Sequence, residues 1–157
     1  MKQLLFSFFI LCCVSLFPAY SHGGTDPAKV TPKTNNISTR IIQFEVDAKA
    51  PDAPTQVKEF IDELKVQFAD QPLNIKIVGR TCDLGPKAYN HQLATQRAYE
   101  VMEMMMNKGL NIDYLEVESL GEEQPLVPNT SEQNRRKNRS VAIHVQSGAL
   151  TEFLASL

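Results

Sequence analysis

The sequence predicts an α/β sandwich in which two main helices cover one face of a mixed four-stranded sheet, with a short helix at the C-terminus. Segments suited to strands and segments with helical periodicity follow one another in a β-α-β-α-β-β order. The chain has 157 residues, of which 43% are hydrophobic and 22% charged. That length and composition suit one globular domain with a real core.

The first strand is predicted at residues 40–46, where RIIQFEV is rich in β-branched and aromatic residues. Pro54 is well placed in the first turn of the first helix. One apolar stripe at helical spacing follows, made of Val57, Phe60, Ile61, Leu64 and Phe68. The second strand is predicted at residues 75–79, where Ile75 and Ile77 share one face.

The second helix is predicted at residues 86–108 and should stop at Gly109. One face of it carries Ala94, Arg97, Ala98, Val101 and Met105. Its methionines, Met102, Met104, Met105 and Met106, go round the helix and do not converge. They therefore indicate adaptable core packing and not a metal site.

The third strand is predicted at residues 113–121, and a long polar loop at 122–138 leads to a fourth strand at 140–146. The tail, residues 148–157, spaces its apolar side chains as a helix does: Leu150, Phe153, Leu154 and Leu157. We expect this tail to form a short helix docked on the domain.

The N-terminus has the pattern of a secretory signal peptide, predicted at residues 1–21. A retained membrane anchor is the alternative, whereas lipidation at Cys12 or Cys13 fits poorly because the apolar run continues past both. Residues 22–39 are polar and predict a flexible linker. Cleavage would leave Cys82 as the single cysteine, so no internal disulfide could form. A dimer linked through Cys82–Cys82 remains an alternative.

Polar residues around the second helix suggest a carboxylate-binding pocket. Asn90 and Arg97 lie on nearly the same helical face, and the loop RTCDLGP ends at the helix N-terminus, which favours anions. The segment NRRKNR, residues 134–139, adds four cations, and Asp83 would suit an ammonium group. The alternative is a solvated loop. Nucleic acid is not an expected partner, because the net charge is −2 and exposed aromatics are few.

The segment GRTCDLGPKAYNHQLATQRAYEV resembles the G-H-T-D-x-x-G…Y-N-x-x-L-S-x-x-R-A-x-x-V signature of OmpA-like domains, which include the Pal and flagellar stator types. LGEEQP is similar to the family's G-E-x-x-P turn, and QFEV to its opening strand. NTSEQNRRKNRSV resembles its closing N-x-T/S…R-x-x-N-R-R-V segment. The resemblance covers residues 40–147, with the motifs in the family's order and spacing.

The resemblance implies non-catalytic binding of peptidoglycan, through the diaminopimelate of its peptide stem. The helix arginine that grips the carboxylate would be Arg97. The other positions that match family motifs are Thr81, Asn90, Leu93, Asn138 and Arg139. Ser140 stands where the family has a second arginine, and Asp47 falls near a position that is often Asn.

The loop departs from the family at its acid. Cys82 occupies the position of the ammonium-binding Asp, Arg80 replaces the usual His, and Asp83 comes one residue late. Asp83 could swing in, a thiolate could substitute, or diaminopimelate binding could be weakened or lost. Cys82 and Asp83 are therefore both candidate ligand residues, with Asp83 or a weakened site preferred.

The sequence thus predicts an exported protein of the periplasm or outer membrane, which touches the membrane only indirectly or through its signal segment. It is expected to be neither an enzyme nor dependent on a cofactor or metal. Its expected partners are peptidoglycan and other envelope proteins. One alternative is an OmpA-like scaffold that has lost the wall site and binds a protein. A thiol hydrolase built from Cys82, His91 and Asp83 is the least favoured reading, because no motif aims His91 at the thiol.

Overall fold

The structure is a computed structural model that describes residues 37–157. The predicted signal peptide, residues 1–21, lies outside the described residues, as does the predicted linker up to residue 36. Within the described part, no helix is both long and apolar enough to cross a membrane.

The domain is built on one four-stranded mixed sheet with the strand order β1-β4-β2-β3. Its strands are β1 (Ile37–Gln43), β2 (Leu73–Arg80), β3 (Ile112–Gly121) and β4 (Ser140–Ser147). β4 pairs antiparallel with β1 and β2, whereas β2 and β3 run parallel. The parallel pair needs a crossover connection, which a helix supplies. The predicted α/β class is confirmed.

The first strand begins and ends earlier than predicted. We expected residues 40–46, but the ladder with β4 runs from the Ile37–Gln146 pair to the Gln43–Ser140 pair. Residues 37–39, predicted as the end of the linker, therefore belong to the sheet. Their pairing with β4, and not an apolar pattern of their own, makes them a strand.

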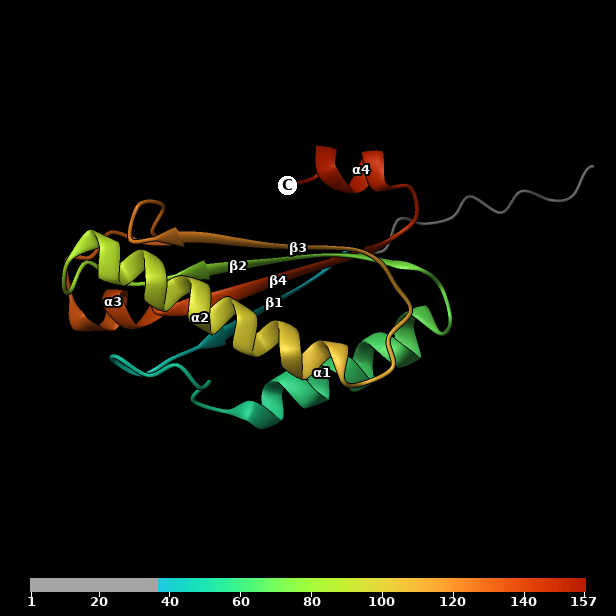
Figure 1. The fold of residues 1–157 in the computed structure, drawn as a ribbon, viewed down its shortest axis with the longest axis horizontal. Helices are drawn as coiled ribbons and strands as arrows, with labels where there is room; N and C mark the ends of the chain where they lie inside the picture. Colours follow the sequence, from blue (N-terminus) through green and yellow to red (C-terminus); the bar gives the residue numbers. More distant parts are fainter. Residues whose placement is uncertain (1–36) are drawn as a thin grey trace, which may run out of the picture. The chain divides into compact units, whose positions relative to one another are not determined.

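Two helices, α1 (Pro54–Phe68) and α2 (Lys87–Met106), cover one face of the sheet (Figure 1). Every residue of the two predicted apolar faces is buried, Arg97 included. The core between helices and sheet also takes side chains from β2 and β4, such as Ile75, Ile77 and Ile143. The amphipathic patterns therefore identified both helices and the faces they bury.

The methionines of α2 only partly follow the prediction of core packing. Met105 is buried, and Met102 and Met104 pack against the core from partly buried positions. Met106, in contrast, is 54% exposed and lies outside the core.

Gly79 of β2 lets α2 approach the sheet closely. A Cβ atom at this position would collide with the carbonyl oxygen of Ala94 on α2. Because Ala94 lies one helical turn from Arg97, this contact helps to set the depth at which Arg97 is buried.

A third helix, α3 (Glu132–Asn138), stands where a polar loop was predicted. Ser131 caps it, since its hydroxyl accepts a 3.2 Å hydrogen bond from the backbone N–H of Asn134. Glu132 in the first turn and Arg135 to Lys137 in the last turn suit the helix dipole. The helix has no apolar stripe, which is why a search for hydrophobic periodicity missed it.

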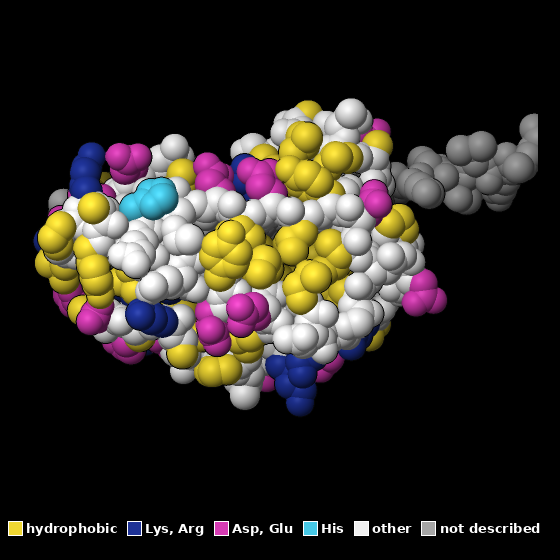
Figure 2. All heavy atoms as spheres, viewed as in Figure 1, with side chains coloured by type: hydrophobic (Ala, Val, Ile, Leu, Met, Phe, Trp, Pro, Cys, Tyr) yellow, Lys and Arg dark blue, Asp and Glu magenta, His cyan; other side chains and the backbone are white. Residues whose placement is uncertain are grey.

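The predicted C-terminal helix is α4 (Leu150–Ala155), which lies on the face of the sheet opposite α1 and α2 (Figure 1). Only Phe153 is buried, and its ring meets that of Tyr114 on β3 edge-on, with 6.4 Å between centroids. Leu154 and Leu157 stay about half exposed, and hydrophobic side chains show at the surface over α4 (Figure 2).

Candidate functional site

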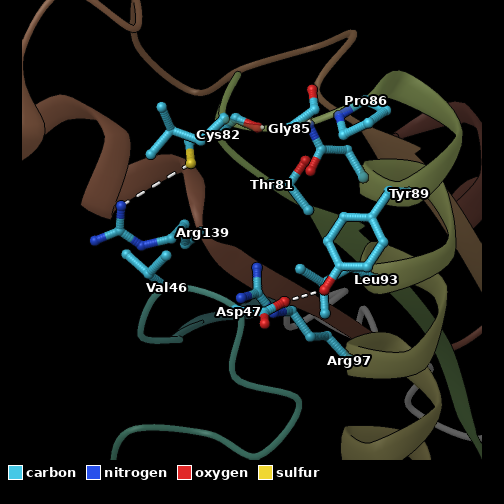
Figure 3. Close-up of a pocket in the computed structure, with 12 residues that line it drawn as sticks. Val46, Asp47, Thr81, Cys82, Gly85, Pro86, Tyr89, Leu93, Arg97 and Arg139 are labelled. Carbon is cyan, nitrogen blue, oxygen red and sulfur yellow. Dashed lines mark hydrogen bonds between the residues drawn. The ribbon is translucent and has the colours of Figure 1, made fainter.

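The candidate site is a pocket of about 450 Å³ at the end of the sheet where β1 and β2 finish and α2 begins (Figure 3). Six of the eight residues predicted from the sequence line it: Thr81, Cys82, Asn90, Leu93, Arg97 and Arg139. The other two, Asp83 and Asn138, do not. Four separate segments of the chain therefore meet here: the loop after β1, the loop after β2, helix α2, and Arg139 at the end of α3.

Arg97 is one of two buried cations of the pocket and has no exposed surface. Its Nε donates to the Ala48 carbonyl at 2.7 Å and its Nη2 to the Glu45 carbonyl at 2.9 Å. Its guanidinium carbon lies 5.0 Å from the centre of the Phe44 ring. Burial lowers the pKa of Arg97 to about 10, so the group is still charged at neutral pH.

Two buried polar atoms of the pocket have no hydrogen-bond partner. They are Nη1 of Arg97 and Oγ1 of Thr81, and both residues line the cavity. An unpaired buried donor is costly, so native proteins nearly always satisfy such atoms. A carboxylate bound in the pocket could accept from both groups, since it offers two oxygens.

Cys82 lies beside the second cation of the pocket. The Arg139 Nη1 atom is 4.0 Å from the Cys82 sulfur, and its Nη2 donates to Glu132 on α3 at 2.8 Å. Burial lowers the pKa of Arg139, but the hydrogen bonds to Glu132 and Cys82 outweigh this and leave the pKa raised. The thiol is 4% exposed. A Cys82–Cys82 link between two folded molecules would therefore require local opening.

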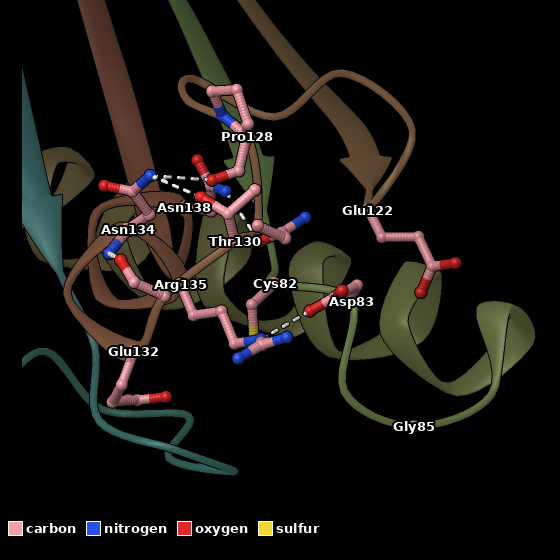
Figure 4. A network of polar contacts seen from close by, with 12 residues as sticks. Cys82, Asp83, Gly85, Glu122, Pro128, Thr130, Glu132, Asn134, Arg135 and Asn138 are labelled. Carbon is pink, nitrogen blue, oxygen red and sulfur yellow. Dashed lines mark hydrogen bonds and ion pairs between the residues drawn. The ribbon is translucent and has the colours of Figure 1, made fainter.

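Asp83 is held outside the pocket by α3 (Figure 4). The Nε of Arg135 donates to its carboxylate at 2.8 Å. This hydrogen bond lowers the pKa of Asp83 below its ordinary value. Of the two neighbours in the loop, the thiol and not the acid lines the pocket.

A different acid, Asp47, lines the pocket. Its backbone is in the left-handed region at φ 59°, which places it in the turn after β1. The Tyr89 hydroxyl on α2 donates to its carboxylate (Figure 3), and this bond raises the pKa of Tyr89. The sequence placed Asp47 near a family Asn but gave no reason to include it in the site.

Asn90 and Asn138 act on the loops around the pocket. Asn90 donates from its side chain to the Cys82 carbonyl at 3.3 Å, which ties the loop after β2 to α2. Asn138 accepts from the Val127 N–H at 3.0 Å and donates to the Val127 carbonyl at 2.7 Å. It therefore fixes the segment before α3, and α3 in turn positions Arg139 and Arg135.

The three residues of a thiol hydrolase are not assembled. His91 lines a separate, small hollow with Gly121, and Asp83 is paired with Arg135, so neither lines the pocket with Cys82. Within residues 37–157, no group of three or more His, Cys, Asp or Glu side chains could hold a metal ion.

Comparison with known proteins matches residues 44–139 to the OmpA family. The solved structure of the peptidoglycan-associated lipoprotein from Burkholderia pseudomallei is 25% identical with a TM-score of 0.58, covering 68% of this chain and 90% of that one. That of the C-terminal domain of Helicobacter pylori MotB is 26% identical with a TM-score of 0.60, covering 74% and 90%. Both confirm the fold.

Among curated relatives, outer membrane porin F of Pseudomonas fluorescens is 27% identical over 118 residues, or 70% of this chain. The chain spans only 35% of the length of that relative and 23% of the length of the motility protein B of H. pylori. The similarity therefore describes the domain and not the activities of those longer proteins.

Proposed function

The chain belongs to the OmpA family, and from that premise we propose that it binds peptidoglycan without catalysis, through the carboxylate-bearing end of a diaminopimelate residue. The observation that carries the proposal is the pair of unpartnered buried atoms in the pocket, Arg97 Nη1 and Thr81 Oγ1. The name of the similar peptidoglycan-associated lipoprotein supports the same ligand.

The charges of the pocket suggest how such a ligand would lie. Its carboxylate would meet Arg97, while its ammonium group would turn toward Asp47, which is more exposed. Asp47 thereby takes the role that the loop acid has in the family pattern, because Cys82 has no carboxylate and Asp83 is engaged by Arg135. A zwitterionic amino-acid end matches a pocket with buried cations, Arg97 and Arg139, and one acid nearer the surface.

The protein would work in the cell envelope, exported by its N-terminal segment and held at the wall on the periplasmic side of the outer membrane. The relatives support this place, since two of them are named as outer membrane proteins. Other envelope proteins would be its further partners.

A test is co-sedimentation with purified, protein-free peptidoglycan. Wild type should be retained, and Arg97→Gln should lose about tenfold or more in affinity, the effect of one charge-assisted hydrogen bond. Arg136→Gln is the matched control, because Arg136 is an exposed cation that does not line the pocket. Thermal unfolding of each variant separates lost binding from lost folding.

Competition sharpens the assignment. Free diaminopimelate should release the wild type more effectively than pimelate, which has the same carbon chain and carboxylates but no ammonium groups. Absence of retention by folded wild type would reject the proposal and favour the second candidate, a scaffold for a protein partner. That candidate is supported by the cysteine that stands where the family pattern has an acid.

A further inference from the structure

Cys82 lines the same pocket as two polar groups that have no hydrogen-bond partner. The Cys82 sulfur lines the cavity and is free of any disulfide. Arg97 lines the same cavity with no exposed surface and with Nη1 lacking a partner, and Thr81, 2% exposed, adds an unpartnered hydroxyl (Figure 3). These two atoms indicate an anionic ligand independently of the cysteine.

A ligand that satisfies those atoms would lie in the cavity that Cys82 also lines. In half-cystine, only two carbon atoms separate the carboxylate carbon from the sulfur, so such a molecule fits easily within about 450 Å³. Its carboxylate on Arg97 would leave its sulfur in the same cavity as Cys82. Asp47 is available for the ammonium group that such a molecule carries.

We propose that Cys82 is a site of reversible mixed-disulfide formation with small carboxylate-bearing disulfides of the cystine type, which the pocket selects through Arg97 and Thr81. The Cys82 thiolate attacks one sulfur of the small disulfide, a new S–S bond forms, and the original S–S bond breaks. The proton lost by Cys82 goes to the departing thiolate. Cys82 is oxidised and the leaving half is reduced, so no further oxidant is consumed.

The adduct has a consequence for the wall site. A half-cystine on Cys82 would fill the space that a stem peptide needs, so modification should switch retention off and a thiol reductant should restore it. This consequence rests on the proposed function, whereas formation of the adduct does not.

The test compares cystine with cystamine, a disulfide that keeps the ammonium groups and lacks the carboxylates. The full chain is treated with each, and trypsin then releases residues 81–87, TCDLGPK, which carry Cys82 apart from Cys12 and Cys13. Mass spectrometry of this peptide follows each rate. The ratio of cystine to cystamine rates should be about tenfold higher in the folded protein than in denaturant, the preference expected from one charge-assisted contact.

Equal ratios in the folded and denatured protein would overturn the proposal, because the folded pocket would then not select the carboxylate-bearing disulfide. No adduct in the folded protein would overturn it as well. Retention on peptidoglycan is measured separately on modified and unmodified wild type. Cys82→Ser should form no adduct at this peptide, and its retention should be the same with and without cystine. Failure of unmodified wild type to bind the wall would reject the proposed function and leave the adduct result intact.

Discussion

Nε of Arg135 donates a 2.8 Å hydrogen bond to the carboxylate of Asp83, and of the neighbours Cys82 and Asp83 only Cys82 lines the pocket. The loop acid is thus committed to α3 and not to a ligand. The consequence is that the two neighbouring loop residues should respond differently to substitution.

Asp83→Asn should leave the affinity for diaminopimelate within about twofold of wild type, because Asp83 does not line the pocket. Its effect should appear in the acid stability of the fold. The pKa of Asp83 is lowered by the bond from Arg135, so the stabilisation is present above the ordinary carboxyl pKa and is lost as pH falls through the lowered value. The melting temperature of wild type should therefore exceed that of the variant at neutral pH, and the two should become equal at acid pH.

Cys82→Asp should strengthen binding of diaminopimelate and leave pimelate unchanged or weaker. A carboxylate at this position would add an acid for the ligand ammonium, beside the cations Arg97 and Arg139. Isothermal titration with the two ligands measures the difference. A variant that gains equally for both ligands would show that the substitution acts on the pocket shape and not on its charge.

Asp47→Asn should weaken the binding of diaminopimelate by about tenfold and leave the binding of pimelate unchanged. The substitution removes the negative charge that would meet the ligand ammonium and keeps the size of the side chain. The same substitution should lower the pKa of Tyr89 toward its ordinary value, because the hydrogen bond to Asp47 is the largest cause of its elevation. Ultraviolet titration of the phenol checks this second effect. An unchanged Tyr89 titration would contradict the Tyr89–Asp47 contact itself.

Asn138→Ala should lower the free energy of unfolding by about 1–2 kcal/mol, because it removes two hydrogen bonds to the half-buried backbone of Val127. Lys137→Ala is the matched control, since Lys137 is exposed and adjacent on α3. Denaturant unfolding monitored by circular dichroism gives both values. Equal values for the two variants would mean that Asn138 does not anchor this segment.

Gly79→Ala should destabilise the fold by about 2 kcal/mol or more, since the added methyl group would collide with the Ala94 carbonyl. Gly109→Ala is a useful comparison, because its Cβ would meet nothing within 4 Å but its φ of 71° is strained for alanine. A pocket that keeps full affinity in a folded Gly79→Ala protein would show that α2 can shift without moving Arg97.

Helix α1 and the site residue Arg97 could be predicted from the sequence, whereas helix α3 could not. The stripe from Val57 to Phe68 predicted α1 because hydrophobic burial sets its period, and Arg97 was found because helical spacing puts it on the face of Asn90. α3 was missed because it has no apolar stripe. Hydrogen bonds between the side chains of Ser131 and Asn138 and backbone groups hold it in place instead.

The direction of Asp83 could not be predicted for the same reason. It depends on Arg135, which belongs to the missed helix. The position of Asp47 depends on its own left-handed backbone conformation and on the hydrogen bond from Tyr89, forty-two residues away. No periodic pattern in the sequence predicts either feature.

The position of β1 also has a mechanical consequence. The pocket lies beyond the Gln43 end of this strand, while residues 1–36 enter at its Ile37 end, about 20 Å away for seven residues of strand. A pull between a wall-bound pocket and the preceding chain would therefore run along β1 and load its ladder with β4 in shear. All the ladder bonds from Ile37–Gln146 to Gln43–Ser140 would then share the force together, and the strand would resist being peeled off one bond at a time.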